Sequence, residues 1–404
     1  MRSLMPISFP TVSHLLTCLR ARAWCSQGGI FGSGILNASP PAAPPPLPPP
    51  GPISPAAAPG AAMSINGHWL TNWGNALTIT PTTFYDISSS GAASETTIDT
   101  FGQNYFITQN SPTASFYPSK WNKVQFHTVG TGFGYCSSVY DANTRMDALT
   151  SDTTATYDPT DATSGCGASG FGHNIASPYN MPIAGTYLDN WGSYITINNN
   201  YWYSGNNYNN ISVYSQGMAL IQTSPTAWDP LTWSKMHYHT VDTGFGFCTT
   251  AYGQANASDA LKAPIVYNAS DAASGCGANG YGHNIASPYN LPIAGTYTDS
   301  YQNTPITVSN TQWISGGTVH NIEMYTNEYF VYQVPMTATW NPGKWSKIHY
   351  HTVGTGFGYC TTAYGQDTAT AALMAAIVYN ASDAASGCGS SGFGHSVASP
   401  TTGR

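Results

Sequence analysis

The chain has 404 residues, of which only 7% are charged, and its 11 Lys and Arg against 18 Asp and Glu give a net charge of −7. Duplex nucleic acid and anionic membranes bind clustered cations, so this balance argues against both as partners. Only three of the acids are Glu while 13% of residues are aromatic, which favours strands over long helices with Glu/Lys pairs. No run of 18 apolar residues occurs, so we expect no transmembrane segment.

Residues 1–62 contain no Asp or Glu, and the stretch Pro40–Pro59 is almost wholly Pro, Ala and Gly. Such a stretch lacks apolar side chains and backbone donors, so it predicts a disordered Pro/Ala-rich leader. The leader is interpreted either as a targeting segment or as an over-extended gene model, because Met63 directly precedes the first repeat.

One pattern then opens three times, at Ile65–Trp69, Ile183–Tyr187 and Ile293–Tyr297. A later tryptophan recurs every 112 residues, at positions 121, 233 and 345. A period this long is a whole domain and not a solenoid unit. The sequence therefore predicts three tandem domains, which we place at residues 63–180, 181–290 and 291–404.

The second copy shows the expected elements in chain order. The alternating stretch Tyr194–Ile197 belongs to a first hairpin, Val213–Thr223 holds a second strand group, and Trp233–Val241 and Gly244–Cys248 are further strands. Ser258–Ala263 favours a short helix before the final cysteine segment. Six to eight short strands in about 110 residues predict an all-β fold, with each copy a small β-barrel or β-sandwich.

The opening Gly-x-Trp or Gly-x-Tyr, ahead of an up-and-down strand pattern, resembles the start of calycin barrels, the lipocalin and avidin group. The resemblance implies a barrel that binds a small molecule in its mouth. Each copy is shorter than a typical lipocalin, and its cysteine pair and Gly-Phe-Gly-Tyr-Cys segment are not part of the calycin pattern. The ligand-contacting residues of avidin have no counterparts that can be placed here, so the ligand stays open.

Each copy holds two cysteines, 28 to 30 residues apart: Cys136 and Cys166, Cys248 and Cys276, Cys360 and Cys388. This regular pairing predicts one disulfide within each domain. Closing a loop of that length stabilises a domain by roughly 3.6 kcal/mol in the chain-entropy model. Disulfides imply an oxidising compartment, so we expect an extracellular or organelle-lumenal protein. Three pairs of reduced thiols in a cytosolic protein are the alternative.

A row of functional side chains is predicted on one strand of each copy. Alternate residues share a strand face, so Met236 and Tyr238 lie on the core side. The opposite side carries Trp233, Lys235, His237 and His239. We take this Trp-Lys-His row and its equivalents as candidate ligand-binding residues: Trp121, Lys123, His127, Trp345, Lys347, His349 and His351.

Three interpretations of the row stay open. Together with a later histidine of each copy (His173, His283 or His395), paired imidazoles have the composition of a Zn or Cu site. The row can also contact an organic ligand, or form a strand face whose histidines bond locally. Gln125 replaces one histidine in the first copy and weighs against an identical metal site in all three, so we assign no metal and no cofactor.

Motifs for hydrolysis or nucleotide binding are missing from the sequence. The one acid present in every copy, at Asp161, Asp271 and Asp383, is interpreted as an Asx-turn or cap because a glycosidase needs a pair of carboxylates. The paired glycines of the Gly-Phe-Gly segments mark a point where the strand must bend or a neighbour comes close, and we interpret them as architectural. Aromatic residues of the opening segments, such as Trp69 and Trp73, either belong to the core or stack on sugar rings.

These observations favour a secreted or lumenal, non-enzymatic protein whose three copies give multivalent binding of a small polar ligand or a glycan. A histidine-dependent enzyme, with or without a metal, and a structural wall or matrix protein are the alternatives. The sequence does not determine the oligomeric state.

Overall fold

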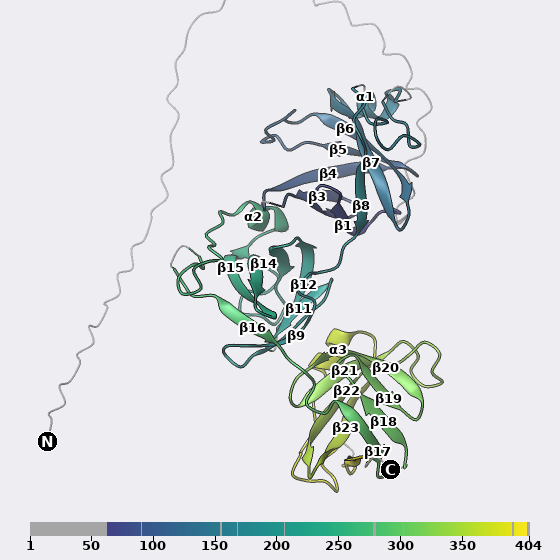
Figure 1. Cartoon of the computed structure of the whole chain (residues 1–404), viewed down its shortest axis with the longest axis vertical. Coiled ribbons are helices and arrows are strands. Elements are labelled where there is room, and N and C mark those ends of the chain that lie inside the picture. Colours follow the sequence, from purple (N-terminus) through teal and green to yellow (C-terminus); the bar gives the residue numbers. More distant parts are fainter. Residues whose placement is uncertain are drawn as a thin grey trace, which may run out of the picture. The chain divides into compact units, whose positions relative to one another are not determined.

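The computed structural model describes residues 63–401 apart from positions 90, 154–155, 168, 206, 278–279, 302 and 390–391. Over these residues the protein is all-β and consists of three closed antiparallel barrels in tandem, each of eight strands (Figure 1). The predicted all-β fold class is confirmed, and of the two expected architectures each copy has the barrel. The predicted leader, with Cys18 and Cys25, lies outside the described residues.

Each barrel is a simple meander in which every strand pairs with the next and the last pairs with the first. Barrel 1 contains β1 Gly67–Thr71, β2 Ala76–Ile79, β3 Thr83–Ile87, β4 Ala93–Phe101, β5 Tyr105–Gln109, β6 Trp121–Val129, β7 Gly132–Ala142, α1 Arg145–Thr150 and β8 Asn174–Pro178. Barrel 2 contains β9 Gly185–Asp189, β10 Tyr194–Ile197, β11 Tyr201–Ser204, β12 Asn207–Tyr214, β13 Met218–Gln222, β14 Trp233–Val241, β15 Gly244–Gln254, α2 Ala257–Lys262 and β16 Asn284–Pro288. Barrel 3 contains β17 Gly295–Asp299, β18 Pro305–Val308, β19 Gln312–Ser315, β20 Thr318–Tyr325, β21 Tyr329–Gln333, β22 Trp345–Val353, β23 Gly356–Gln366, α3 Ala369–Met374 and β24 Ser396–Pro400.

The meander decides which loops meet. In an antiparallel barrel the connections alternate between the two ends, so every connection from an odd-numbered to an even-numbered strand lies at the same end. We call this end, which also carries the helix, the mouth end of each barrel. No helix among the described residues is long and apolar enough to cross a membrane.

Inward-facing residues fill most of each barrel. On β14, Met236 and Tyr238 belong to the buried cluster of barrel 2, as the period of two requires. The opening aromatics belong to the same interiors, because the Trp69 ring lies 4.9 Å from the Phe133 ring in an edge-to-face arrangement. Tyr187 and Tyr297 make the same contact in the other two barrels. For these three residues the core interpretation is the better one.

The long connection before the last strand of each barrel is held by the predicted disulfide. Cys136–Cys166, Cys248–Cys276 and Cys360–Cys388 all form, which confirms the pairing. The repeated acid organises the same connection: Asp271 Oδ1 accepts the amides of Ala273 (3.2 Å) and Ser274 (3.0 Å). This is the expected Asx-type turn, and hydrogen bonds from Ser274 lower the pKa of the carboxyl.

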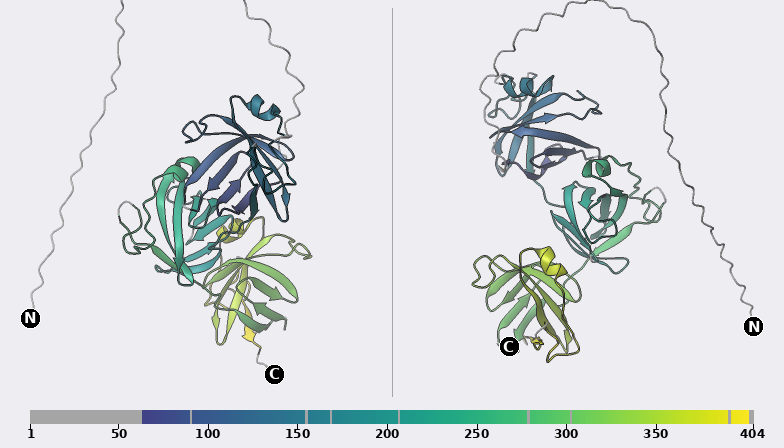
Figure 2. Two further views of the ribbon diagram at one scale, coloured as in Figure 1. Left: turned by 45° about the horizontal axis from the view of Figure 1, so that its top comes forward. Right: turned by 180° about the vertical axis from the view of Figure 1, so that it is seen from behind.

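The Gly-Phe-Gly segment lies where two neighbours come close. A Cβ on Gly244 would lie 2.0 Å from the carbonyl oxygen of Ala286, and one on Gly246 would lie 2.6 Å from Cε1 of His239. Both glycines are therefore needed for packing, as the sequence indicated. The short helix packs beside β6, β14 or β22. Figure 2 shows the helices outside the barrels.

Candidate functional site

The predicted Trp-Lys-His row lies on the outer wall of each barrel. Since Met236 and Tyr238 point into barrel 2, Lys235 and His237 point away from it, toward α2 and the disulfide-linked connection. The connection covers them so well that Lys235 is only 2% exposed. The alternation of residues along the strand therefore predicted the core face correctly. The opposite face, with Lys235 and His237, is covered by the disulfide-linked connection.

The buried lysine binds the end of the short helix. Lys235 Nζ donates to the carbonyl oxygens of Leu261 (2.8 Å) and Ala263 (2.6 Å), which lack partners inside the helix. Lys347 donates to Leu373 (2.8 Å), and Lys123 makes the matching bonds in barrel 1. The ammonium also faces the negative end of the helix dipole. Burial lowers the pKa of Lys347 to about 8.

The first histidine of the row bonds to the neighbouring strand. His237 Nδ1 lies 2.9 Å from Thr250 Oγ1, and this hydroxyl donates its single proton to the carbonyl of Lys235. Nδ1 of His237 is therefore the donor, which fixes the neutral tautomer. Burial and then the charge of Lys235 lower the pKa of His237 to about 4, and His349 in barrel 3 behaves alike.

The second histidine belongs to an aromatic cluster. His239 Nδ1 bonds to the hydroxyl of Tyr267, and the His283 ring stacks on Tyr267 with ring centroids 5.2 Å apart. Both ring nitrogens of His283 are buried without a hydrogen-bond partner among the described residues. Burial, followed by the neighbouring His283, lowers the pKa of His239. No group of three or more His, Cys, Asp or Glu in the described part of the chain is placed to hold a metal ion.

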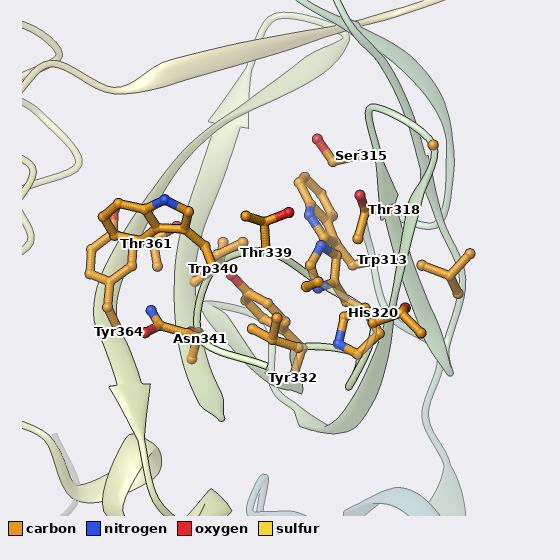
Figure 3. A pocket seen from close by; sticks show the side chains of 18 of the residues that line it. Trp313, Ser315, Thr318, His320, Tyr332, Thr339, Trp340, Asn341, Thr361 and Tyr364 are labelled. Atoms are coloured by element: carbon orange, nitrogen blue, oxygen red, sulfur yellow. The ribbon is translucent and has the colours of Figure 1, made fainter. Parts of the chain in front are cut away.

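A different site, the barrel mouth, was not assigned residues by the sequence. In barrel 3 a cavity of about 860 Å³ opens at the mouth end, between inward-facing strand residues and the loop from β21 to β22. Figure 3 shows Trp340 and Tyr364 on one side of this cavity and Trp313 and His320 on the other.

The lining of this cavity combines aromatic rings with hydroxyl and amide groups and contains no Asp, Glu, Lys or Arg. Burial lowers the pKa of His320, so its imidazole is neutral near pH 7. Its Nδ1 has no hydrogen-bond partner among the described residues. The polar and aromatic lining residues are Trp313, Ser315, Thr318, His320, Tyr332, Thr337, Thr339, Trp340, Asn341, Ser346, Tyr359, Thr361 and Tyr364.

The cavity recurs at the same place in barrel 1, with a volume of about 570 Å³. Its lining residues Phe116, Asn122 and Tyr140 are equivalent to Trp340, Ser346 and Tyr364 of barrel 3, and each lies 224 positions earlier in the sequence. Within barrel 1 the lining has one charged side chain, Glu95. The repeated position shows that the mouth is a property of the fold shared by these two barrels.

Exposed aromatic residues surround the mouth end, and the sequence analysis named only some of them. The loop between the fifth and sixth strands carries Phe116, Trp228 or Trp340, each at least 80% exposed. The same short motif marks this loop in all three copies. A Thr-Ala pair comes first, and the aromatic residue follows it, two positions before a proline. That signal, compared among the copies, could have identified the position.

Comparison with known proteins adds no relative: no protein-family model, no curated protein and no solved structure matches the chain.

Proposed function

We propose that the chain is a non-enzymatic, multivalent binding protein that takes a small polar ligand or a glycan in the mouths of its barrels. One observation carries this proposal: a cavity at the same place in barrels 1 and 3, lined by aromatic rings and hydrogen-bonding groups, all of which are neutral in barrel 3. Ligand sites in proteins combine these two features, since rings supply contact area and a few polar groups supply orientation.

The lining favours a neutral ligand and binding without turnover. An ionic ligand would lose its hydration in barrel 3 without meeting an opposite charge, which costs free energy. The same lining offers neither a pair of carboxylates nor a cysteine or lysine nucleophile beside a base. Hydroxyls and amides match the hydroxyl groups of a polar ligand one for one.

The disulfides and the repetition support the remaining parts of the proposal. Three closed disulfides favour an oxidising compartment, either extracellular or lumenal. Tethered mouths, of which those of barrels 1 and 3 hold the cavity, raise the apparent affinity for a ligand that presents several copies of one group, because every binding step after the first is intramolecular.

The test is a thermal-unfolding screen of the full chain against neutral sugars and other neutral polar compounds. A compound at ten times its Kd stabilises a binding domain by about 1.4 kcal/mol, which raises the Tm of a domain this size by roughly 5–10 °C. A chain whose mouths are filled by tryptophan should lose that shift; the substitutions are S137W, T249W and T361W. The matched control replaces valines at the opposite end (V129A, V241A and V353A). A screen without any stabilising compound, or equal stabilisation of the filled chain, would contradict the proposal.

A further inference from the structure

The exposed aromatic residues of this protein are concentrated at one end of each barrel. Twelve aromatic side chains that are 43–94% exposed occupy four equivalent positions in the three copies. All four positions lie at the end of the seventh strand or in connections from an odd to an even strand, which is the mouth end. They are Trp73, Phe116, Tyr140 and Phe171; Trp191, Trp228, Tyr252 and Tyr281; and Tyr301, Trp340, Tyr364 and Phe393.

In barrel 3 three of these residues, Trp340, Tyr364 and Phe393, border a continuous surface. The mouth cavity and a second hollow of about 350 Å³ share Tyr359, Thr361 and Tyr364. The second hollow continues past the Cys360–Cys388 disulfide to Phe393. A ligand that enters the mouth beside Trp340 can therefore extend across Tyr364 toward Phe393.

From this surface we infer that each mouth binds a neutral oligosaccharide, with one sugar unit in the cavity and further units along the exposed aromatic residues. The inference rests on the proposed function and names its ligand class. One face of a pyranose ring carries C–H groups with partial positive charge, and these stack on the negative face of an aromatic ring. The hydroxyl groups at the edge of the sugar remain free to bond to threonine, serine and asparagine side chains of the lining.

Other occupants fit this surface less well. Phosphate or sulfate groups would require cations, and neither hollow of barrel 3 has a Lys or Arg in its lining. A protein partner or a second copy of the chain would bury a large patch with an apolar centre, whereas here the cavity lining mixes aromatic rings with hydroxyl-bearing residues. A surface that offers both flat rings and hydroxyl groups suits a chain of sugar rings.

The experiment is isothermal titration of the full chain with monosaccharides, disaccharides and hexasaccharides of neutral glucans, mannans, xylans and N-acetylglucosamine polymers. Two triple variants separate the cavity from the extension. The rim variant (F116A, W228A and W340A) should weaken binding of disaccharides and hexasaccharides alike, by about tenfold. The extension variant (F171A, Y281A and F393A) should weaken only the hexasaccharide, by a similar factor. All six side chains are exposed, so the Tm should stay unchanged.

The outcomes separate this inference from the proposed function. Affinity independent of oligosaccharide length, or an extension variant that weakens disaccharides equally, would overturn the extended surface. Binding of a neutral compound that is not a sugar, with no sugar bound, would overturn the inference and leave the proposed function standing. A change in sedimentation of the sugar-free variants would identify the aromatic residues as a self-association surface and would also overturn the inference.

Discussion

Replacing Lys235 with methionine tests whether the Trp-Lys-His row is part of the wall or part of a ligand site. Methionine replaces the aliphatic part of the side chain but lacks the ammonium group, so it leaves the carbonyls of Leu261 and Ala263 without their donor. Each buried acceptor left unpaired costs about 1–3 kcal/mol, and removal of a buried charge offsets part of that sum. We expect barrel 2 to lose about 2 kcal/mol of stability. The amides of α2 should be the first to lose their protection against hydrogen exchange.

Hydrogen exchange of peptides that cover α2, together with urea unfolding of the full chain, measures this effect. Lys262 on the same helix is the matched control, because its side chain is 60% exposed and its replacement by methionine should change stability by less than about 0.5 kcal/mol. The wall interpretation would be refuted if K235M were as stable as the parent chain but no longer bound a ligand that the parent chain binds.

Two further predictions concern the same wall. Burial and then the neighbouring lysine lower the pKa of His237 and His349 from 6.5 to about 4, so the unfolded chain binds more protons between those pH values. Stability should therefore fall as pH drops from 6.5 to 4, by up to about 3 kcal/mol in each of the two barrels. The double variant H237Q and H349Q, which places glutamine where barrel 1 has Gln125, should reduce the pH dependence of the urea midpoints. An unchanged profile would contradict this. G246A should destabilise barrel 2 by about 1–3 kcal/mol because its Cβ displaces the His239 ring; an unshifted urea midpoint would count against that packing.

The sequence determined much of the fold because the relevant signals are local. The alternating stretch Tyr194–Ile197 and the row Trp233–Val241 became β10 and β14, with the predicted side facing the core. The disulfides followed from a spacing repeated three times. The role of Lys235 could not be predicted, because its partner Leu261 is 26 residues away and meets it only when the connection folds back onto the wall.

The residues of the mouth escaped prediction for a related reason, although the calycin resemblance implied a site there. Trp228 and Trp340 are visible in the sequence, but an aromatic residue in a β-domain usually belongs to the core, and only barrel closure shows that these two are exposed. Closure also gathers loops that are far apart in the chain, so that Trp313 and Tyr364 line one cavity. Spacing along the chain carries no information about such a set.

Comparison among the three copies separates what the fold requires from what the mouth recognises. The wall positions repeat closely: a lysine bonds to the helix end in every barrel, buried in barrels 2 and 3 and half-buried in barrel 1, and a disulfide closes every connection. At the mouth, by contrast, the position of His320 is Thr96 in the first copy and Asn209 in the second. Because all three barrels share one strand order, such changes alter the side chains at the mouth without altering the barrel. Under the proposed binding function, this division favours mouths with related but different ligand preferences, because interchangeable sites would not require such changes.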